Sequence, residues 1–251
     1  MAAADQIIER TVRKAQDSAR EAAFLRSARS HCAAHRRRVE KLFAVDMDGV
    51  IIDSNPIHRQ VWALYNRRFG IDTDEDMQQR MYGRRNDEIV RDFSGEHLTQ
   101  DEVRAHGAAK ERLFRATIAP QINEALVPGV REFLERHSDR RMGLATNAEP
   151  ANVEFLLETA QLRRYFQAVV DGHQVRNPKP HPEIYLRAAD LLGSAPDDCV
   201  VFEDSVAGIQ AARAAGMRVV GLRTTLAELP PVDLAIDHFN SPELEPWLAG
   251  R

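Results

Sequence analysis

The stretch LFAVDMDGVIIDS, residues 42–54, decides the fold of this chain. It ends an apolar run with two aspartates, Asp46 and Asp48, that stand two positions apart. Carboxylates are rarely buried in proteins unless they are paired or bound to a metal ion. Either the run ends at the rim of a sheet, where the two acids face solvent by accident, or the pair carries out chemistry. The other segments of the sequence decide between these interpretations.

Short apolar runs recur along the chain, and helical segments separate them. The runs after the first are RMGLATN at 141–147, AVVDG at 168–172, CVVFED at 199–204 and RVVGL at 218–222. Apolar strands without polar alternation, separated by helices, indicate a parallel sheet that is covered on both faces. The sequence therefore predicts an α/β fold with a Rossmann-like parallel sheet, and its tail at 233–248 adds a last short strand and helix.

Two segments depart from this alternation. Residues 55–125 have helical periodicity and no clear strand, so we expect a helical cap inserted after the first strand. The core is then formed by 41–54 and 126–251. Residues 1–40 form a predicted N-terminal helical extension, because its apolar residues recur at steps of three and four. The extension either packs on the body of the protein or contacts a partner or second copy.

Composition limits the classes of function. The formal net charge of −4 argues against a general affinity for nucleic acid. The two cysteines, Cys32 and Cys199, provide neither a disulfide framework nor a metal cluster. No apolar stretch is long enough to span a membrane, and the N-terminus lacks the apolar core of a signal peptide. We therefore expect a cytoplasmic protein without a membrane or nucleic-acid partner.

Polar residues and one glycine stand at the ends of the predicted strands or just before a helix. In chain order they are Asp46, Asp48, Gly49, Thr146, Asn147, Lys179, Glu203 and Asp204. Open parallel sheets bind ligands at the carboxyl ends of their strands, which lie on one edge. We therefore expect these groups to converge.

The four acids of this set would repel one another strongly in one cleft. A hard divalent cation relieves that repulsion, and oxygen ligands of this kind suit Mg²⁺. Thr146 offers a hydroxyl group and backbone N–H donors to phosphate oxygens. Lys179 offers a compact positive charge in a chain that has four lysines among 34 basic residues.

These groups suggest a phosphoryl-transfer mechanism. Asp46 can attack phosphorus and form an aspartyl phosphate. Asp48 points to the same side of an extended chain and can protonate the leaving alkoxide, then accept a proton from the attacking water. Mg²⁺ and Lys179 offset charge on the transferring oxygens.

The segments DMDGV, LATN, NPKPHPEIY and VFEDSVAGIQAARAAGM resemble, in order and spacing, the four motifs of the haloacid dehalogenase superfamily. The resemblance covers about residues 42–224 and is closest to the β-phosphoglucomutase-like phosphatases. It implies that Asp46 is the nucleophile and Asp48 the acid/base. It also implies that Asp46, the main-chain carbonyl of Asp48, and Asp204 hold Mg²⁺, with Glu203 close by. The dehalogenase branch lacks the second aspartate, so Asp48 argues against dehalogenation.

The residues that would distinguish a phosphatase from a mutase lie in the expected cap and in the loop after the second motif. His58 stands at the spacing of the mutase relatives, in which a histidine helps to position the acid/base aspartate. Those relatives also grip a second phosphate with cationic residues, whereas this chain has Glu149, Tyr82 and Asn86 at the corresponding positions.

Three further cap residues are candidates for a role. Arg84 and Arg85 either clamp a phosphate or form a solvated charge run. Lys110 is the only lysine of the cap, where the phosphonate-cleaving branch has a Schiff-base lysine, but its setting GAAKERLFRA is typical of an ordinary helix.

The expected function is therefore a Mg²⁺-dependent phosphatase of a small phosphorylated metabolite, such as a sugar phosphate. Its substrate contacts are expected at Gly49, Asn147, His58, Arg84, Arg85 and Asn86. A phosphosugar mutase similar to β-phosphoglucomutase is the alternative. A catalytically inactive relative that binds a partner through its N-terminal helix is a third hypothesis, and the four intact motifs argue against it. Self-association through that helix is a further prediction.

Overall fold

The computed structural model of the protein describes residues 42–82, 84–95 and 97–250. The predicted helix over 1–40 lies outside the described residues, and so do Cys32 and the predicted self-association through that helix. Among the helices that are described, none combines the length and the apolar character that crossing a membrane requires.

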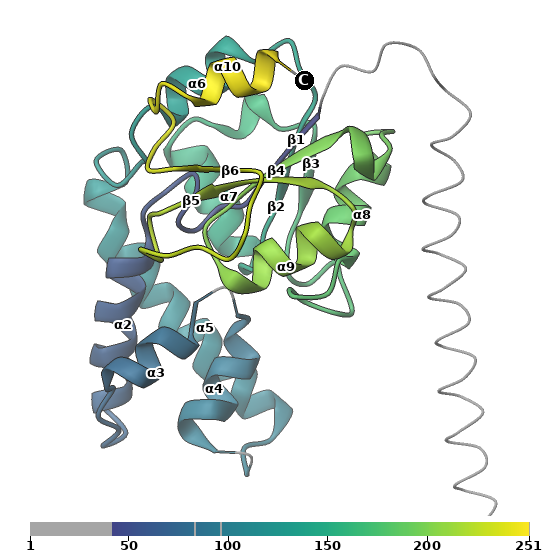
Figure 1. Cartoon of the computed structure of the whole chain (residues 1–251). Coiled ribbons are helices and arrows are strands. Elements are labelled where there is room, and N and C mark those ends of the chain that lie inside the picture. The colour runs from purple at the N-terminus through teal and green to yellow at the C-terminus, as the bar shows by residue number, and fades with distance from the viewer. Residues whose placement is uncertain (1–41, 83, 96, 251) are drawn as a thin grey trace, which may run out of the picture.

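Six parallel strands form one sheet in the order β3-β2-β1-β4-β5-β6 (Figure 1). The strands are β1 (Leu42–Val45), β2 (Met142–Ala145), β3 (Ala168–Val170), β4 (Cys199–Glu203), β5 (Arg218–Leu222) and β6 (Leu234–Ile236). Each strand lies within an apolar run or tail segment from which the sequence predicted one. The predicted α/β fold with a Rossmann-like parallel sheet is therefore confirmed.

Helices cover both faces of the sheet because both sides of its strands are apolar. The helical segments of this part are α6 (Val130–Arg136), α7 (Pro150–Thr159), α8 (Glu183–Leu191), α9 (Val206–Ala214), α10 (Leu244–Ala249) and the short 3₁₀ turns Arg163–Tyr165 and Pro196–Asp198. Successive side chains of a strand point to opposite faces. Phe43 and Val45 accordingly pack with α6, α7 and α10, whereas Leu42 and Ala44 pack with α8 and α9.

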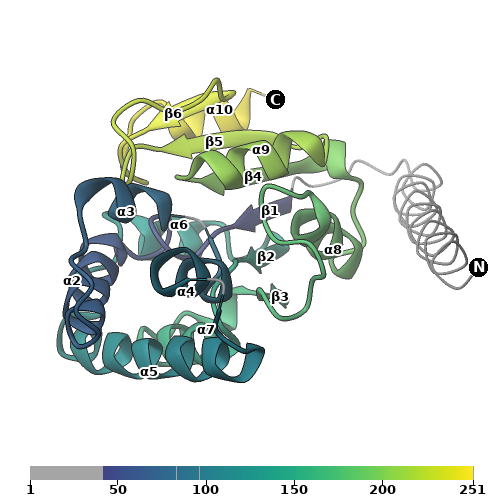
Figure 2. The same ribbon diagram turned by 90° about the horizontal axis from the view of Figure 1, so that it is seen from below.

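Four helices and a 3₁₀ turn lie between β1 and α6 in the sequence. They are α2 (Asn55–Arg67), α3 (Glu75–Arg80), α4 (Asn86–Ser94), α5 (Gln100–Ile118) and the turn Ala119–Gln121. Figure 1 shows the four helices together below the sheet, and Figure 2 views the molecule from their side. They share an apolar cluster that includes Trp62 and Phe93, while Phe114 and Ile118 of α5 join the core of the sheet.

The inserted helices are connected to the sheet at one place. Ile52 and Leu126 form an antiparallel bridge between the two connecting segments, and the N–H of Asp53 donates to the carbonyl of Ala125 at 2.7 Å. Gly49 has a φ of +76°, which allows the chain to turn sharply after β1. The insertion therefore begins and ends beside the carboxyl end of β1.

Candidate active site

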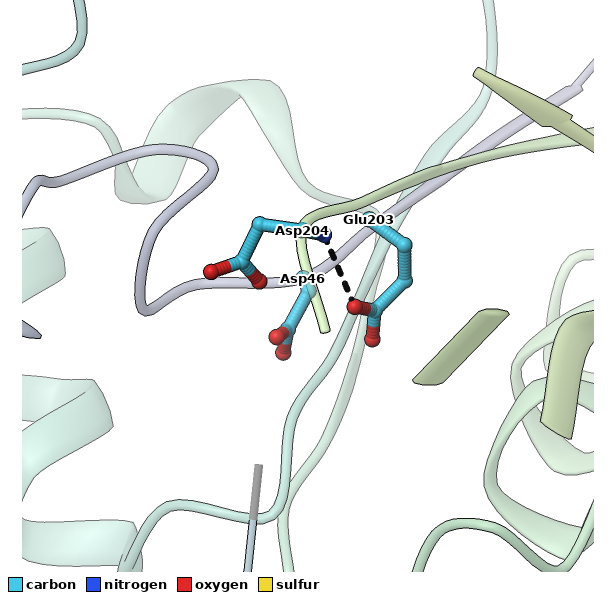
Figure 3. A group of neighbouring side chains, drawn as sticks. All are labelled: Asp46, Glu203 and Asp204. Atoms are coloured by element: carbon cyan, nitrogen blue, oxygen red, sulfur yellow. Dashed lines mark hydrogen bonds between the residues drawn. The ribbon is translucent and has the colours of Figure 1, made fainter. Parts of the chain in front are cut away.

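Three carboxylates meet at the carboxyl ends of β1 and β4. Val45 of β1 pairs with Phe202 of β4. The next residues, Asp46 and Glu203, therefore lie side by side at the carboxyl ends of the two strands. Asp46, Glu203 and Asp204 are all buried, and an oxygen atom of each lies within 4.8 Å of the others. Figure 3 shows their side chains gathered around one region. The structure thus brings together the acids that the sequence placed at two separate strand ends.

Lys179 is the cation of this cluster. Its Nζ atom lies 3.0 Å from Asp46 Oδ1 and 2.6 Å from Glu203 Oε1, and the side chain is buried. The backbone N–H of Lys179 donates to Asn147 Oδ1 at 3.3 Å, which connects the loop before α8 to the end of β2. One ammonium group is therefore shared by two carboxylates.

Glu203 is occupied by donors of the protein itself. Its Oε1 atom accepts from Lys179 Nζ and from the hydroxyl of Tyr185 at 2.8 Å. Its Oε2 atom accepts from the backbone N–H groups of Asp204 and Ser205, at 2.9 Å and 3.0 Å. These contacts hold Lys179 beside Asp46, and the pocket is lined by Asp46 and Asp204 rather than by Glu203.

The cluster carries more negative charge than Lys179 offsets. Burial, with the charges of Glu203 and Asp48, raises the pKa of Asp46 to about 7, although Lys179 acts in the opposite direction. Burial and the charges of Glu203 and Asp46 raise the pKa of Asp204 well above its ordinary value. Asp46 Oδ1 is buried without a well-aligned hydrogen-bond donor among the described residues, although Lys179 Nζ is close. A divalent cation with oxygen ligands fits this set of residues.

Asp48 is held by Ser54 and His58. Ser54 Oγ donates to Asp48 Oδ1 at 2.5 Å, and His58 Nε2 lies 3.5 Å from the same oxygen. Lys110 Nζ lies 2.8 Å from His58 Nδ1, and because an ammonium only donates, Nε2 carries the hydrogen that faces Asp48. Burial by itself would raise the pKa of Asp48, but His58 and Ser54 hold it below the ordinary value.

Lys110 lies in helix α5, as its setting predicted, but the sequence analysis did not anticipate where its side chain lies. Its side chain is buried, and its Nζ lies 2.7 Å from Glu111 Oε1 and 4.9 Å from the ring centre of Trp62. Lys110 and Glu111 both line the pocket that contains Asp46. The scarcity of lysine in this chain, which drew attention to Lys179, was the sequence signal that could have identified Lys110.

The predicted residues from the second strand and the first turn also lie at this site. Thr146 and Asn147 follow β2, the neighbour of β1, and line the same pocket. Gly49 lies against Asp204, so that a methyl group in place of its hydrogen would overlap the Asp204 carboxylate and approach Thr225 Oγ1. The turn after β1 therefore requires glycine for its backbone conformation and for space.

A matched pair of glycine substitutions tests this requirement. Gly49 and Gly70 have similar φ values of +76° and +72°, but nothing lies within 4 Å of a methyl group added at Gly70. We expect Gly70→Ala to lower the free energy of unfolding by about 1 kcal/mol, the cost of a left-handed alanine. Gly49→Ala should cost about 1–3 kcal/mol more because Asp204 must move. Urea unfolding of both variants measures the difference, and equal losses would contradict the steric explanation.

Two residues that the sequence analysis did not single out contact Asp204. Thr225 Oγ1 donates to Asp204 Oδ2, and Asn55 Nδ2 lies 3.4 Å from that oxygen and 2.5 Å from Thr225 Oγ1. Thr225 follows β5, which ends at the same edge of the sheet, so its position after a strand was an available signal. Asn55 begins α2, and no feature of the sequence distinguished it from other helix-start residues.

Some of the predicted substrate contacts in the inserted helical segment line the pocket, and one does not. Arg84 lines the pocket, but its Nη1 atom lies 2.8 Å from Asp92 Oδ2. Arg85 lies 3.3 Å from Asp87 and lines a neighbouring hollow instead. Asn86 lines the pocket, as His58 does. The structure therefore brings Arg84 and Asn86 to the site and directs Arg85 elsewhere.

Glu111 forms a buried pair with Lys110 whose contribution to stability depends on pH. Burial alone would raise the pKa of Glu111, but Lys110 and His58, with a hydrogen bond from Asn152, lower it from 4.5 to about 2. The pair therefore stabilises the fold fully above about pH 4.5, and this contribution is lost as the pH falls toward 2.

Glu111→Gln is expected to lower the free energy of unfolding by about 3 kcal/mol at pH 7, because Lys110 loses its buried partner. The glutamine amide would also face a donor in either orientation, since both Glu111 oxygens accept hydrogen bonds. Urea unfolding at pH 7, 5, 4 and 3 measures the loss, which should shrink below pH 4.5. Glu154→Gln, at an exposed position of α7, is the matched control. A loss that stays constant with pH would exclude the ion pair as its cause.

The fold and the acid cluster are those of an α/β protein with a candidate active site at the carboxyl edge of its sheet. A model of the haloacid dehalogenase-like hydrolase family matches residues 40–216. The chain belongs to this family, as the resemblance of its four motifs implied.

Relatives of the chain include phosphatases and phosphoglucomutases. It is 36% identical over 180 residues to the fructose-1-phosphate phosphatase YqaB of Escherichia coli, covering 71% of this chain and 94% of that protein. It is 34% identical over 185 residues to the phosphorylated carbohydrates phosphatase of Thermotoga maritima, covering 70% and 82%. It is 31% identical over 189 residues to the β-phosphoglucomutase of Bacillus subtilis, covering 72% and 83%. The predicted enzyme class, a phosphatase of this family, is confirmed.

A solved structure of similar fold is that of β-phosphoglucomutase from Clostridium difficile. The two chains superpose with a TM-score of 0.72 at 24% sequence identity, over 84% of this chain and 97% of that one. At this level of identity the likeness concerns the fold.

Proposed function

We propose that this protein is a Mg²⁺-dependent phosphatase that hydrolyses small phosphorylated metabolites, sugar phosphates among them, through an aspartyl phosphate on Asp46. The observation that carries the proposal is the buried cluster of Asp46, Glu203 and Asp204, in which the Lys179 ammonium contacts Asp46 and Glu203. Asp46 and Asp204 would hold the ion together with the main-chain carbonyl of Asp48, while Glu203 is occupied by protein donors. The ion would offset charge on the phosphate oxygens.

In the first step, a carboxylate oxygen of Asp46 attacks phosphorus, and the bond from phosphorus to the leaving oxygen breaks. Asp48 donates its proton to that oxygen, so that a neutral alcohol leaves. A bound phosphate adds negative charge beside Asp48 and so favours the protonated form that this step needs. Lys179 contacts Asp46 and offsets charge as the phosphoryl group arrives.

In the second step, Asp48 accepts a proton from water, the water oxygen attacks phosphorus, and the bond to Asp46 breaks. This step needs Asp48 as a base, and the contacts with His58 and Ser54 that lower its pKa favour that form. Because the His58 ring lies parallel to Phe114 at a centroid distance of 3.8 Å, its orientation toward Asp48 is restrained. Inorganic phosphate leaves and Asp46 is restored.

We also propose that residues 55–125 act as a helical cap over this site. The pocket is lined both by strand-end residues such as Asp46 and by residues of α2, α4 and α5, including Trp62, Asn86 and Lys110. A substrate enclosed between the two parts would be shielded from bulk water during phosphoryl transfer.

The mutase alternative has the support of the relatives named phosphoglucomutases. Against it stand Glu149 and Asn86 in the pocket, because neither offers a cation to a second phosphate. Incubation with β-glucose 1-phosphate distinguishes the two, since a phosphatase releases inorganic phosphate and a mutase forms glucose 6-phosphate faster than it releases phosphate.

Metal removal tests the proposed function. With Mg²⁺, the protein is expected to hydrolyse p-nitrophenyl phosphate, and excess EDTA should abolish turnover until Mg²⁺ is restored. Mg²⁺ at about 100 times its dissociation constant should stabilise the fold by roughly 2.7 kcal/mol, because it binds the native acids. A calorimetric scan at matched ionic strength with NaCl provides the control. Turnover that is unchanged by EDTA would contradict the proposal, and metal binding without turnover of any phosphate ester would favour the inactive-relative hypothesis.

Two predictions from the sequence remain, one about self-association and one about the location of the protein in the cell. Self-association through residues 1–40 concerns a segment outside the described structure, and a cytoplasmic location stays a prediction.

A further inference from the structure

Four side chains form one wall of the pocket where the inserted helices meet the sheet part of the molecule, and we call them the amide–carboxylate wall. They are Asn86 of α4, Glu111 of α5, Glu149 just before α7, and Asn152 of α7. Asn86 Nδ2 lies 2.7 Å from Glu111 Oε1 and 3.0 Å from Glu149 Oε1. Asn152 Nδ2 lies 2.5 Å from Glu111 Oε2. The wall therefore connects two inserted helices to the sheet part of the molecule.

The donors of the wall are largely directed at its own carboxylates. Asn86 uses its amide N–H groups for Glu111 and Glu149, and Asn152 donates to Glu111. The carbonyl oxygen of Asn152 accepts from Arg115 at 2.6 Å. A ligand that reaches Asn86 and Glu149 therefore meets the amide oxygen of one and the carboxylate of the other, both of which are acceptors.

Each lysine or arginine that lines the pocket in the described structure already contacts a carboxylate. Lys110 is shared by Glu111 and His58, and Lys179 by Asp46 and Glu203. The guanidinium of Arg84 contacts Asp92. Because Lys179 contacts Asp46, the proposed nucleophile, the transferring phosphate is expected beside Lys179. The wall contributes two carboxylates, those of Glu111 and Glu149, to the same pocket.

We propose that this wall selects phosphomonoesters whose alcohol part carries hydroxyl or ammonium donors and no second anionic group. The inference rests on the proposed phosphatase function and adds the residues that determine specificity. A hydroxyl or ammonium group donates to Glu149 and to the Asn86 carbonyl oxygen, whereas a second phosphate meets like charge and no available donor of the wall. Like charges near contact reduce affinity roughly tenfold or more even at an effective dielectric constant well above that of a dry interior.

The test compares two ligands that differ by one phosphate, fructose 1-phosphate and fructose 1,6-bisphosphate. The full chain with Mg²⁺ is assayed for phosphate release, and calorimetry with the Asp46→Asn variant gives dissociation constants in the absence of turnover. We expect the wild-type protein to favour the monophosphate at least roughly tenfold in kcat/KM and in affinity. Glu149 is chosen for substitution because it is only half-buried, so that its replacement should leave the fold intact.

Glu149→Gln should raise two ratios by roughly fivefold or more, because the like charge is removed. The first is kcat/KM for the bisphosphate divided by kcat/KM for the monophosphate. The second is the corresponding ratio of association constants, measured with Glu149→Gln in the Asp46→Asn variant. The matched control Glu154→Gln changes an exposed acid of α7, the helix that begins directly after Glu149, and should leave both ratios at the wild-type value. A wild-type protein that binds both ligands equally, or a Glu149→Gln ratio equal to that of the control, overturns the inference. Failure to hydrolyse p-nitrophenyl phosphate would instead overturn the proposed function, while the calorimetric ratio would still report on the wall.

Discussion

Asp46→Asn is expected to lower Mg²⁺-dependent turnover of p-nitrophenyl phosphate by at least about 10⁴-fold, because an amide cannot attack phosphorus to form the covalent intermediate. The substitution should not destabilise the protein. Burial and neighbouring carboxylates raise the pKa of Asp46 to about 7, so the native cluster already disfavours its charge. Steady-state kinetics and thermal unfolding of the same preparation measure both effects.

Asp139→Asn serves as the matched control for this prediction. Asp139 is exposed and precedes β2, so it lies toward the opposite edge of the sheet from Asp46. Its variant should keep wild-type turnover and stability. Full Mg²⁺-dependent activity of Asp46→Asn would show that the nucleophile is another residue. A large fall in melting temperature would mean that Asp46 is needed for the fold, contrary to what its raised pKa indicates.

Lys179→Met is expected to have the largest effect on stability. Lys179 is buried, and its ammonium lies within 3.0 Å of oxygens of both Asp46 and Glu203. Removing it leaves these carboxylates buried without their cation, which typically costs about 3–5 kcal/mol. For a protein of this size we expect a fall in melting temperature of roughly 10 °C, together with loss of turnover. Urea and thermal unfolding measure the first effect, and p-nitrophenyl phosphate turnover measures the second.

A double variant separates the charge effect from the lost packing. In Lys179→Met combined with Glu203→Gln, one uncompensated carboxylate is gone, so part of the stability should return although activity should not. Arg176→Met, three residues earlier and exposed, is the control for removing a cation from the same loop. Should Lys179→Met unfold within about 1 kcal/mol of the wild-type protein, the buried acids must obtain their compensation from elsewhere.

The strand-end residues were predictable from the sequence because two local rules act together. An apolar run without alternation indicates a strand buried on both faces, and the polar residue that ends it must lie at the edge of the sheet. This reasoning placed Asp46, Thr146 and Asp204 correctly relative to their strands, and parallel pairing brings those ends together. Lys179 was found in the same way, from its position before a helix and from the scarcity of lysine.

The residues on inserted helices were harder to place because a helical pattern shows which face is apolar but not what that face packs against. Lys110 and Glu111 lie next to each other on α5, and both are buried against α2 and α4 rather than exposed. Adjacent charged residues in a helix are typical of a solvated surface. Arg84 and Arg85 are likewise neighbours in the sequence, yet only Arg84 lines the pocket.

The sequence by itself determined the parallel sheet, the family and the set of strand-end acids, since each of these depends on local periodicity and on short motifs. Only the tertiary structure decided which side chains of α2, α4, α5 and α7 face those acids. That outcome depends on how the inserted helices pack against the sheet, and their packing brings Asn86 and Glu149, 63 residues apart, into hydrogen-bond contact. Contacts over such separations are set by the shapes and charges of whole elements, which no local pattern of residues specifies.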